Sequence, residues 1–256
     1  MSSDASITKI FSLAGKVAII TGGAGMLGAE YAAVLKEAGA VVIVWDVAKT
    51  ADMRVDITKK KQVESAVSDV LKKHGRIDIL VNNAAMNPVP GSPESREQFL
   101  PYEDIPEKLW GQELAVNLTG ALFCTQAVVP VMKKQGSGSI INISSIYGNV
   151  GPDNRIYEKG QYKSIGYATT KGALLNFTRA WATYLAGTGI RVNTLTLGGV
   201  SAGQEPELIK KYAERTVLGR MAEKYEYRGA ILFLASDASS YMTGSNLIID
   251  GGWTAW

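Results

Sequence analysis

The alternation of short apolar runs with longer segments of helical pattern is the feature that most limits how this chain can fold. Six runs occur along the sequence: "KVAII" at 16–20, "AVVIVWD" at 40–46, "IDILVNNA" at 77–84, "GSIINISS" at 138–145, "GIRVNTLTLGG" at 189–199 and "NLIIDGG" at 246–252. Runs that are apolar on both faces and separated by helices are typical of parallel strands covered on both sides. The sequence therefore predicts one α/β domain over residues 1–256, a doubly wound parallel sheet with helices on both faces.

Composition argues against several classes of function. The net charge is only +3 and no basic run follows an evident helix face, so no nucleic-acid partner is expected. A single cysteine, Cys124, and a single histidine, His74, argue against a His/Cys metal site. A Ser-His-Asp triad would need His74, which ends a charged helical segment. The lone cysteine cannot form an internal disulfide, and it fits a reducing, cytoplasmic setting.

The sequence predicts neither a targeting segment nor a membrane partner. Residues 1–16, "MSSDASITKIFSLAGK", lack the basic start and apolar run of a signal peptide. No apolar stretch is expected to reach the roughly 18 residues that a membrane span needs.

A glycine-rich turn, "TGGAGMLG", follows the first apolar run and opens an Ala-rich helical segment. Gly22 and Gly25 would let the backbone approach a phosphate closely, and Gly28 would let the helix pack tightly on the strand. Met26 and Leu27 would contribute free N–H groups at the helix start. This context predicts a Rossmann-type dinucleotide site, with a purely structural turn as the alternative.

Asp46 ends the second apolar run, 24 residues after Gly22. A carboxylate there accepts hydrogen bonds from the adenosine ribose hydroxyls and repels a 2′-phosphate, so the sequence predicts NAD as the cofactor. A solvated aspartate at a strand end is the alternative. Asp56, with Ile57 beside it, follows a short segment and is placed at the adenine edge.

The stretch "YEKGQYKSIGYATTK" at 157–171 holds three tyrosines at five-residue spacing, and only Tyr167 has a lysine four residues on. Residues four apart share one helix face, so Tyr167 and Lys171 can reach one small molecule together. On spacing alone, an ordinary surface pair is the more frequent explanation.

Eight motifs then occur in order: "TGGAGMLG" at 21–28, Asp56 in "VDI", "NNAA" at 82–85, Asn117 in "VNLTG", "NISS" at 142–145, "YATTK" at 167–171, "IRVN" at 190–193 and "DGG" at 250–252. Each motif is weak alone. Together, in this order and spacing, they resemble the short-chain dehydrogenase/reductase family over nearly the whole chain.

The resemblance implies a role for each of four residues. Tyr167 would be the general acid in ketone reduction and the base in alcohol oxidation, which requires its pKa to fall by about three units. Lys171 would supply a nearby positive charge and bind the nicotinamide ribose. Ser145, rather than its rival Ser144, would hold the substrate oxygen. Asn117 would position a water in the proton path, unless it is simply satisfied by backbone.

The resemblance also places Asn83 and Ala84 beside the cofactor, and Val200 with its backbone at the nicotinamide carboxamide. Five positions depart from the family pattern: Gly25 stands for a usual Ser or Arg, Met26 and Ala85 for a usual Gly, Leu197 for a usual Pro, and Ala202 for a usual Thr. A pyrophosphate contact from position 202 is therefore expected to be missing.

The largest departure is the separation of Ser145 from Tyr167, which are 22 positions apart, whereas the family usually has about a dozen residues between them. The resulting insert, about 149–163, joins two catalytic residues and must lie over the active site. Its cations and tyrosines suit a hydroxyl-rich or anionic substrate, with Arg155, Tyr157 and Tyr162 as candidate substrate residues. A subunit contact is the alternative for the insert.

Further features of the sequence resemble a subgroup linked to bacterial surface-sugar biosynthesis of the legionaminic type. These are "PDNRIY" in the insert, "LGGV" and the terminal "DGGWTAW". A substrate loop is expected at about 200–215.

The segment from Ser164 to a stop at Gly187 or Gly189 is apolar nearly all round and is expected to be buried on every face. With the two tryptophans of "GWTAW", it suggests a subunit interface. The family resemblance implies a homotetramer or homodimer.

The sequence thus predicts an NAD-dependent oxidoreductase that interconverts a secondary alcohol and a ketone of a small polar, sugar-like substrate. One alternative is a 3-oxoacyl thioester reductase, which would prefer NADPH. The other is a dinucleotide-binding sensor without turnover, which would not need a Tyr/Lys acid–base pair.

Overall fold

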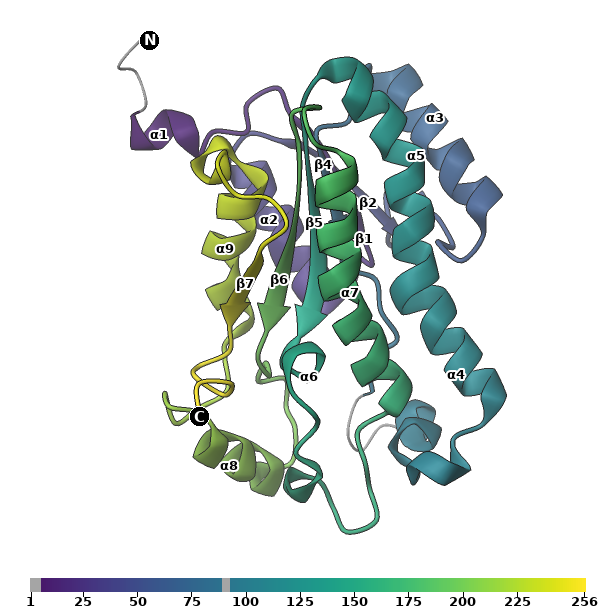
Figure 1. Cartoon of the computed structure of the whole chain (residues 1–256), viewed down its shortest axis with the longest axis vertical. Coiled ribbons are helices and arrows are strands. Elements are labelled where there is room, and N and C mark those ends of the chain that lie inside the picture. The colour runs from purple at the N-terminus through teal and green to yellow at the C-terminus, as the bar shows by residue number, and fades with distance from the viewer. Residues whose placement is uncertain (1–5, 89–92) are drawn as a thin grey trace.

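The computed structural model describes residues 6–88 and 93–256; the start of the N-terminal stretch and the segment 89–92 lie outside this part. Its strands form one sheet with the order β3-β2-β1-β4-β5-β6-β7 (Figure 1). All neighbouring pairs are parallel. The bounds are β1 (Val17–Thr21), β2 (Val41–Asp46), β3 (Met53–Arg54), β4 (Ile79–Asn82), β5 (Gly138–Ser145), β6 (Ile190–Leu197) and β7 (Asn246–Ile249). The predicted doubly wound sheet is confirmed.

Helices cover both faces of the sheet (Figure 1). Their bounds are α1 (Ile7–Ile10), α2 (Met26–Glu37), α3 (Lys60–His74), α4 (Glu107–Leu114), α5 (Gly120–Gln135), α6 (Ile146–Asn149), α7 (Ile165–Tyr184), α8 (Pro206–Arg215) and α9 (Arg228–Ala235). A π-helical turn, η3 (Ala115–Thr119), joins α4 to α5. Short 3-10 turns are η1 (Pro93–Phe99), η2 (Tyr102–Asp104), η4 (Asn154–Ile156), η5 (Lys224–Tyr227) and η6 (Asp237–Ser239).

The sheet is apolar on both faces because each face is the floor of its own core. In β1, Ala18 and Ile20 pack with residues of α2 and α9. The alternate residues, Val17 and Ile19, pack with α3, α5 and α7. Successive strand side chains point to opposite faces, so a strand covered on both sides needs apolar residues at every position. This explains the unbroken apolar runs in the sequence.

A buried polar ladder crosses the middle strands and ties α7 to them. Asn82 on β4 donates to Asn142 Oδ1 on β5 at 2.8 Å, and Asn142 donates to Thr178 Oγ1 on α7 at 2.8 Å. The Thr178 hydroxyl in turn lies 2.7 Å from the Thr194 hydroxyl on β6. Each of these side chains thereby gains at least one hydrogen-bond partner, although the Asn82 Oδ1 has none, and a one-residue register slip would break the series. The ladder therefore fixes where β5 and α7 end relative to each other.

The α7 helix begins as predicted and ends earlier than predicted. The Ser164 side chain caps it by accepting from the Tyr167 N–H at 3.2 Å. The helix stops at Tyr184, before the glycines expected to end it. Its side chains toward the sheet are buried, whereas Tyr184 on the outer side is exposed in the single chain; the prediction that a second subunit covers this outer face stays a prediction.

The two C-terminal tryptophans have different surroundings. Trp253 is 2% exposed and stacks on Tyr212 with ring centroids 4.4 Å apart. Trp256 is 70% exposed, and its indole N–H donates to the Arg215 carbonyl. The expectation that both need a second subunit is wrong for Trp253, because the chain buries it internally.

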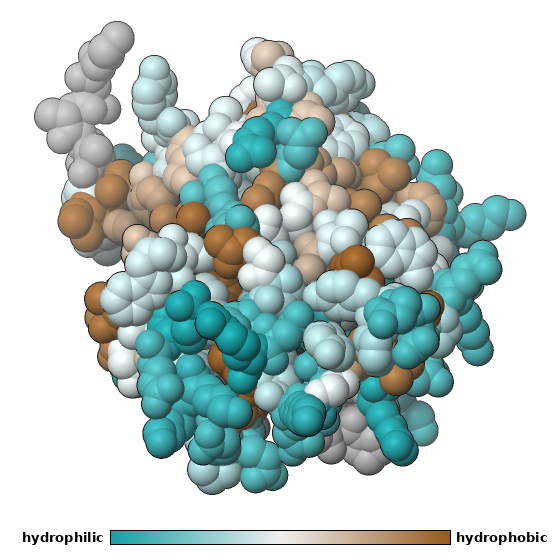
Figure 2. All heavy atoms as spheres, turned by 60° about the horizontal axis from the view of Figure 1, so that its bottom comes forward, coloured by the Kyte–Doolittle hydropathy of each residue, from teal (hydrophilic) through white to brown (hydrophobic). Residues whose placement is uncertain are grey.

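The segments that follow the strands gather at one end of the molecule, at the bottom of Figure 1, with α6, α8 and the insert 149–163. Asp153 of the insert pairs with Arg215 of α8 at 3.1 Å, and Tyr162 N donates to Phe99 O at 3.0 Å. Figure 2 brings this end forward and shows hydrophilic residues over much of it, with apolar residues between them. The insert therefore lies where the strands end.

Within the described residues, one helical stretch, Glu107–Gln135, is long and apolar enough to cross a membrane by length and composition alone. One such helix is weak evidence, because core helices of soluble proteins pass the same test. Here the stretch packs against α3 and α7.

Candidate active site

A cavity of about 700 Å³ lies at the carboxyl ends of the strands. Gly22 and Asp46 line one end, Ser145 and Tyr167 line the middle, and Tyr157 of the insert lines the other end. Ligands of doubly wound sheets bind at this edge, beside the point where the strand order reverses. In this sheet the reversal falls between β1 and β4.

The glycine turn forms a cradle that side chains would fill. Gly22 has φ +63°, and a Cβ there would lie 2.7 Å from the Ala84 Cα. A Cβ on Gly28 would lie 2.4 Å from the Gly22 carbonyl oxygen. Helix α2 begins at Met26, and its N-cap Gly25 has no side chain to occupy the first N–H groups. Free N–H groups at a helix start and bare backbone fit the phosphates of a dinucleotide.

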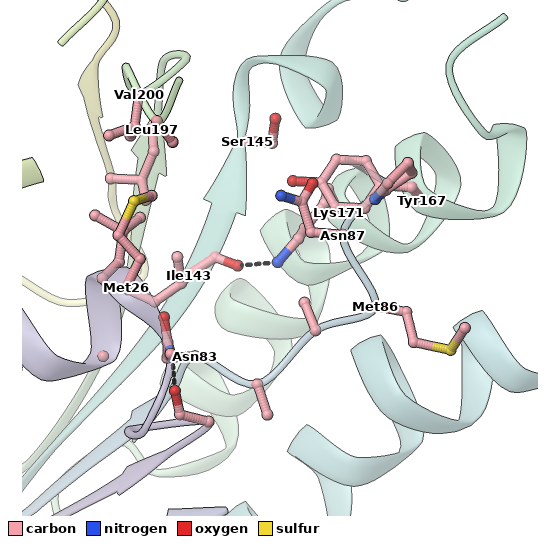
Figure 3. A pocket seen from close by; sticks show the side chains of 18 of the residues that line it. Met26, Asn83, Met86, Asn87, Ile143, Ser145, Tyr167, Lys171, Leu197 and Val200 are labelled. Carbon is pink, nitrogen blue, oxygen red and sulfur yellow. Dashed lines mark hydrogen bonds between the residues drawn. The ribbon is translucent and has the colours of Figure 1, made fainter. Parts of the chain in front are cut away.

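Thr21 and Asn83 hold this turn in place. The Thr21 hydroxyl accepts from the backbone N–H groups of Asn83 and Ala84, both at 3.1 Å. The Asn83 amide donates to the carbonyls of Thr21 and Gly22, both at 3.0 Å (Figure 3). Asn83 and Ala84, which were predicted to lie beside the cofactor, line the cavity, but the Asn83 side chain is already bonded to the turn. The role of Thr21 was not predicted.

The acidic residues expected at the adenosine end also line the cavity. Asp46 accepts from the backbone N–H groups of Ala24 and Ala48, both at 3.1 Å, which fixes its carboxylate against the glycine turn. Asp56 accepts from the Thr58 N–H at 2.9 Å and hydroxyl at 2.6 Å. Ile57 lines the same wall.

Ser145, Tyr167 and Lys171 meet in the middle of the cavity (Figure 3). Tyr167 and Lys171 lie one turn apart on α7, with the Lys171 Nζ 5.6 Å from the centre of the Tyr167 ring. Lys171 Nζ donates to the Ile143 carbonyl at 2.7 Å. The Ser144 hydroxyl instead donates to the Lys171 carbonyl at 2.8 Å. Of the two serines, Ser145 is the one whose hydroxyl lies beside the Tyr167 hydroxyl, where the substrate oxygen would bind.

Burial sets the pKa values of the Tyr/Lys pair. It raises the pKa of Tyr167 to about 12, although the Ser145 hydroxyl acts in the opposite direction. It lowers the pKa of Lys171 to about 8. Removal from water disfavours the charged form of both groups. The expected lowering of the Tyr167 pKa is therefore not produced by the groups of this chain alone.

Asn117 lies in the π-helical turn and is buried. Its side chain accepts from the Met86 N–H at 2.7 Å and donates to the Met86 carbonyl at 3.3 Å and to the Thr170 hydroxyl at 3.1 Å. These bonds hold the segment after β4 against α7. The protein therefore supplies hydrogen-bond partners for the Asn117 amide, as expected if this residue has a structural role.

Val200 lines the cavity on a loop that Gln204 organises. The Gln204 amide donates to the Val200 carbonyl at 2.8 Å and accepts from the Ala202 N–H at 2.8 Å. The Tyr212 hydroxyl also accepts from the Gly199 N–H. Neither Gln204 nor Tyr212 was predicted from the sequence. No local pattern marks a side chain that bonds back to the backbone of residues 199–202.

Of the three substrate candidates in the insert, only Tyr157 reaches the cavity. Tyr157 is buried, and its hydroxyl lies 3.1 Å from that of Tyr147. The Arg155 side chain is 81% exposed and paired with Asp153 at 2.7 Å, outside the cavity lining. Tyr162 is 38% exposed and packs edge-on against Tyr102, also outside it. Composition suggested these two residues, but their partners on the protein turn them away.

Lys163 lines the cavity and was not chosen from the sequence. It lies four residues before Tyr167, just as Lys171 lies four residues after it, but only the second interval was considered. Tyr147 completes the aromatic wall beside it.

A doubly wound sheet, a glycine cradle and a Ser/Tyr/Lys group around one cavity define a dinucleotide-dependent oxidoreductase. The chain belongs to the short-chain dehydrogenase/reductase family, whose members are oxidoreductases that act on alcohols and ketones with a nicotinamide dinucleotide. The family model described as enoyl-(acyl carrier protein) reductase matches residues 22–254.

Three relatives illustrate the likeness. The 3-oxoacyl-[acyl-carrier-protein] reductase of Thermotoga maritima is 37% identical, over 94% of this chain and 98% of that protein. A short-chain dehydrogenase of Leptospira borgpetersenii, solved with NAD⁺, is 34% identical with a TM-score of 0.85, over 95% of this chain and 94% of that one. A gluconate 5-dehydrogenase of Burkholderia cenocepacia, solved with NADP and tartrate, is 28% identical with a TM-score of 0.87, over 98% of this chain and 100% of that one.

Proposed function

We propose that this protein is an NAD(H)-dependent dehydrogenase/reductase that interconverts a secondary alcohol and a ketone of a small polar compound. The observation that carries the proposal is one continuous cavity with Asp46 and the glycine cradle at one end and Ser145, Tyr167 and Lys171 further along. A sensor without turnover would need the first set of groups but not the second.

The reaction assigns one task to each side chain. The Ser145 hydroxyl donates to the substrate oxygen and holds it beside the Tyr167 hydroxyl. In reduction, Tyr167 gives its proton to that oxygen; in oxidation, its phenolate takes the proton from the alcohol. Lys171, held by the Ile143 carbonyl at 2.7 Å, favours the phenolate through its charge. A nicotinamide dinucleotide, when bound, supplies or accepts the hydride.

The chain has residues that suit each part of that cofactor. The glycine turn and the first N–H groups of α2 would hold the pyrophosphate. Lys171 would bind the nicotinamide ribose hydroxyls, and the Val200 backbone would face the carboxamide. Asn117 would position a water in the proton path towards Lys171, with its side chain held by Met86 and Thr170.

The preference for NAD rests on Asp46. Its carboxylate is fixed by two backbone N–H groups and lines the cavity, so it suits ribose hydroxyls and repels a 2′-phosphate. The solved relatives do not decide the matter, since one carries NAD⁺ and the other NADP.

The polar substrate class rests on the far end of the cavity, where Tyr147, Tyr157, Lys163 and Tyr212 provide hydroxyls and a cation. The gluconate 5-dehydrogenase relative supports the same class, as does the resemblance of "PDNRIY", "LGGV" and "DGGWTAW" in the sequence to enzymes of surface-sugar biosynthesis. A 3-oxoacyl thioester reductase is the second candidate, and the identity to the Thermotoga maritima reductase favours it.

We also propose a homotetramer or homodimer. The outer side of α7 carries a row of aromatic contacts, Phe177 with Trp181 and Trp181 with Tyr184, of which Tyr184 is exposed. Strand β7 lies at the sheet edge with Ile248 exposed. Both surfaces are suited to a second copy.

The proposal is tested by NADH formation, followed by near-ultraviolet absorbance, with NAD⁺ and a panel of sugars, sugar acids, sugar phosphates and simple secondary alcohols. Turnover of polar compounds with NAD⁺ is expected. Turnover restricted to apolar alcohols would contradict the substrate class, and turnover restricted to NADP⁺ would contradict the role of Asp46. Reduction of 3-oxoacyl thioesters with NADPH would establish the second candidate, and NAD binding without any turnover would support a sensor.

A further inference from the structure

Lys163 is a buried lysine at the substrate end of the cavity. It closes the insert directly before the N-cap of α7, and its backbone N–H donates to the Asn154 Oδ1 at 2.9 Å. Its side chain lines the cavity, and the residue is 6% exposed. The Nζ lies 4.6 Å from the centre of the Tyr167 ring, and 5.9 Å from that of Tyr147. The ammonium group therefore sits beside the residue that handles the substrate proton.

The described partners of the Lys163 ammonium are neutral: two oxygens and the faces of the Phe99, Tyr147 and Tyr167 rings. It donates to the Pro88 carbonyl at 3.2 Å and to the Asn87 Oδ1 at the long distance of 3.4 Å. Among the described side chains, those of residues 6–88 and 95–256, no carboxylate forms an ion pair with it. An ammonium has three donors and a buried cation without a counter-charge is unfavourable.

The carboxylate that attracts the Lys163 ammonium, that of Glu113, does not bond to it and accepts hydrogen bonds from other residues. Glu113 attracts the Lys163 charge, but one of its oxygens accepts from Gln98 at 2.7 Å and the other from Ser164 at 2.7 Å. Lys171 repels Lys163 from the other side. Burial outweighs the attraction and lowers the pKa of Lys163 to about 7. The site thus holds a lysine that an additional negative charge would favour in its protonated form.

The other cations of the insert do not share this position. Arg155 is paired with Asp153, and Lys159 is exposed. Neither residue lines the cavity. Lys163 is therefore the cation of the insert that a ligand in the cavity meets.

We infer that Lys163 binds an anionic group of the substrate, a carboxylate or a phosphate ester, close to the carbon that is oxidised or reduced. The inference rests on the proposed alcohol/ketone chemistry at Tyr167 and narrows its substrate to hydroxy acids or hydroxy phosphates and their oxo forms. The ammonium lies 4.6 Å from the centre of the ring that carries the Tyr167 hydroxyl, so we expect only a few bonds between the anionic group and the reacting carbon. A charged hydrogen bond of this kind also orients the carbonyl toward Ser145 and Tyr167.

The test compares acids with their neutral amides and does not depend on turnover. The probes are 2- and 3-hydroxy acids, the corresponding amides, and glycerol 3-phosphate for the phosphate source. Binding to the full chain is measured by calorimetry at constant ionic strength. Lys163→Met should weaken acid binding by about 10- to 100-fold and leave amide binding unchanged. Lys163→Arg, which keeps the positive charge, should retain part of the affinity for acids. Tighter binding of glycerol 3-phosphate than of the acids would assign the phosphate, and the reverse would assign the carboxylate.

Lys159→Met is the matched control, because it removes an exposed lysine of the same insert that lies outside the cavity. It should bind every probe as the unmodified protein does. Equal loss of acid and amide binding in Lys163→Met would overturn the inference and indicate a general effect on the cavity. Unchanged acid binding, or no binding of any anionic probe by the unmodified protein, would also overturn it.

Turnover of the same probes, measured alongside the calorimetry, separates this inference from the proposed function. Acid binding that depends on Lys163, in a protein that turns over no alcohol or ketone, would refute the dehydrogenase and keep the anion site. Turnover that is equally fast for acids and amides and indifferent to Lys163→Met would keep the dehydrogenase and refute the anion site.

Discussion

The two adjacent serines at the end of β5 provide a matched pair of substitutions, Ser144→Ala and Ser145→Ala. The Ser144 hydroxyl is buried and donates to the Lys171 carbonyl at 2.8 Å. The Ser145 hydroxyl accepts from the Tyr147 N–H at a long 3.3 Å and otherwise faces the cavity. We expect the first change to affect stability alone and the second to affect catalysis.

The magnitudes follow from the partners that each hydroxyl has. Loss of the buried Ser144 bond should cost about 1 kcal/mol, which lowers Tm by about 2–4 °C in a chain of this size. Loss of the Ser145 cap on the four-residue α6 should cost no more than about 1 kcal/mol, so the two variants should have similar Tm values. Because Ser145 holds the substrate oxygen where charge develops, Ser145→Ala should lower kcat by about 10²- to 10³-fold.

The assay is the initial rate of NADH formation at a temperature well below both Tm values, with Tm from thermal unfolding of the same samples. Ser144→Ala should keep kcat within about threefold, because it touches the reacting groups only through the Lys171 backbone. Equal loss of kcat in both variants, or greater loss in Ser144→Ala, would show that the assignment of the two hydroxyls is incorrect.

Three further predictions concern the cradle, the cofactor preference and the buried lysine. Gly28→Ala should abolish NADH binding measured by fluorescence, because the new Cβ would lie 2.4 Å from the Gly22 carbonyl oxygen, whereas Gly111→Ala, with nothing within 4 Å, should bind NADH normally. Asp46→Ser should raise the ratio of kcat/KM for NADP⁺ over NAD⁺ by about tenfold or more, since it removes the charge that repels a 2′-phosphate; an unchanged ratio would assign the preference elsewhere. Lys163→Met should raise Tm most at pH 6, because the folded-state pKa of about 7 lies below the ordinary 10.5 and the charged form is penalised only in the folded protein. The gain should shrink as pH rises from about 7 toward 10.5, and thermal scans that show a constant difference would contradict this sign.

The fold and the centre of the site follow from local patterns in the sequence. Unbroken apolar runs predicted the parallel sheet because both faces are covered, and the glycine turn predicted a bare backbone beside α2. Tyr167 and Lys171 could be paired from the sequence because both lie on α7, where residues four apart share one face. The adjacent serines were ranked by family resemblance, and the hydrogen bond from Ser144 to the Lys171 carbonyl now gives a physical reason for that ranking.

The substrate end could not be predicted in the same way, because it depends on how the insert folds back over the strands. Arg155 was predicted to bind substrate because of its charge, yet it pairs with Asp153. The sequence shows this aspartate two residues before Arg155, so the pairing could have been predicted. Lys163 is buried by contacts with the segment after β4, and Trp253 by stacking on Tyr212. No sequence interval encodes those long-range contacts.

The central claim is that Tyr167 transfers the substrate proton, and one measurement tests it most directly. The rate of NADH formation with saturating NAD⁺ and the best polar substrate is compared between Tyr167→Phe and Tyr162→Phe, a tyrosine of the insert that lies outside the cavity. We predict that Tyr167→Phe lowers kcat by about 10²- to 10⁴-fold with NADH binding preserved, and that Tyr162→Phe changes it little. Equal rates in the two variants would contradict the account.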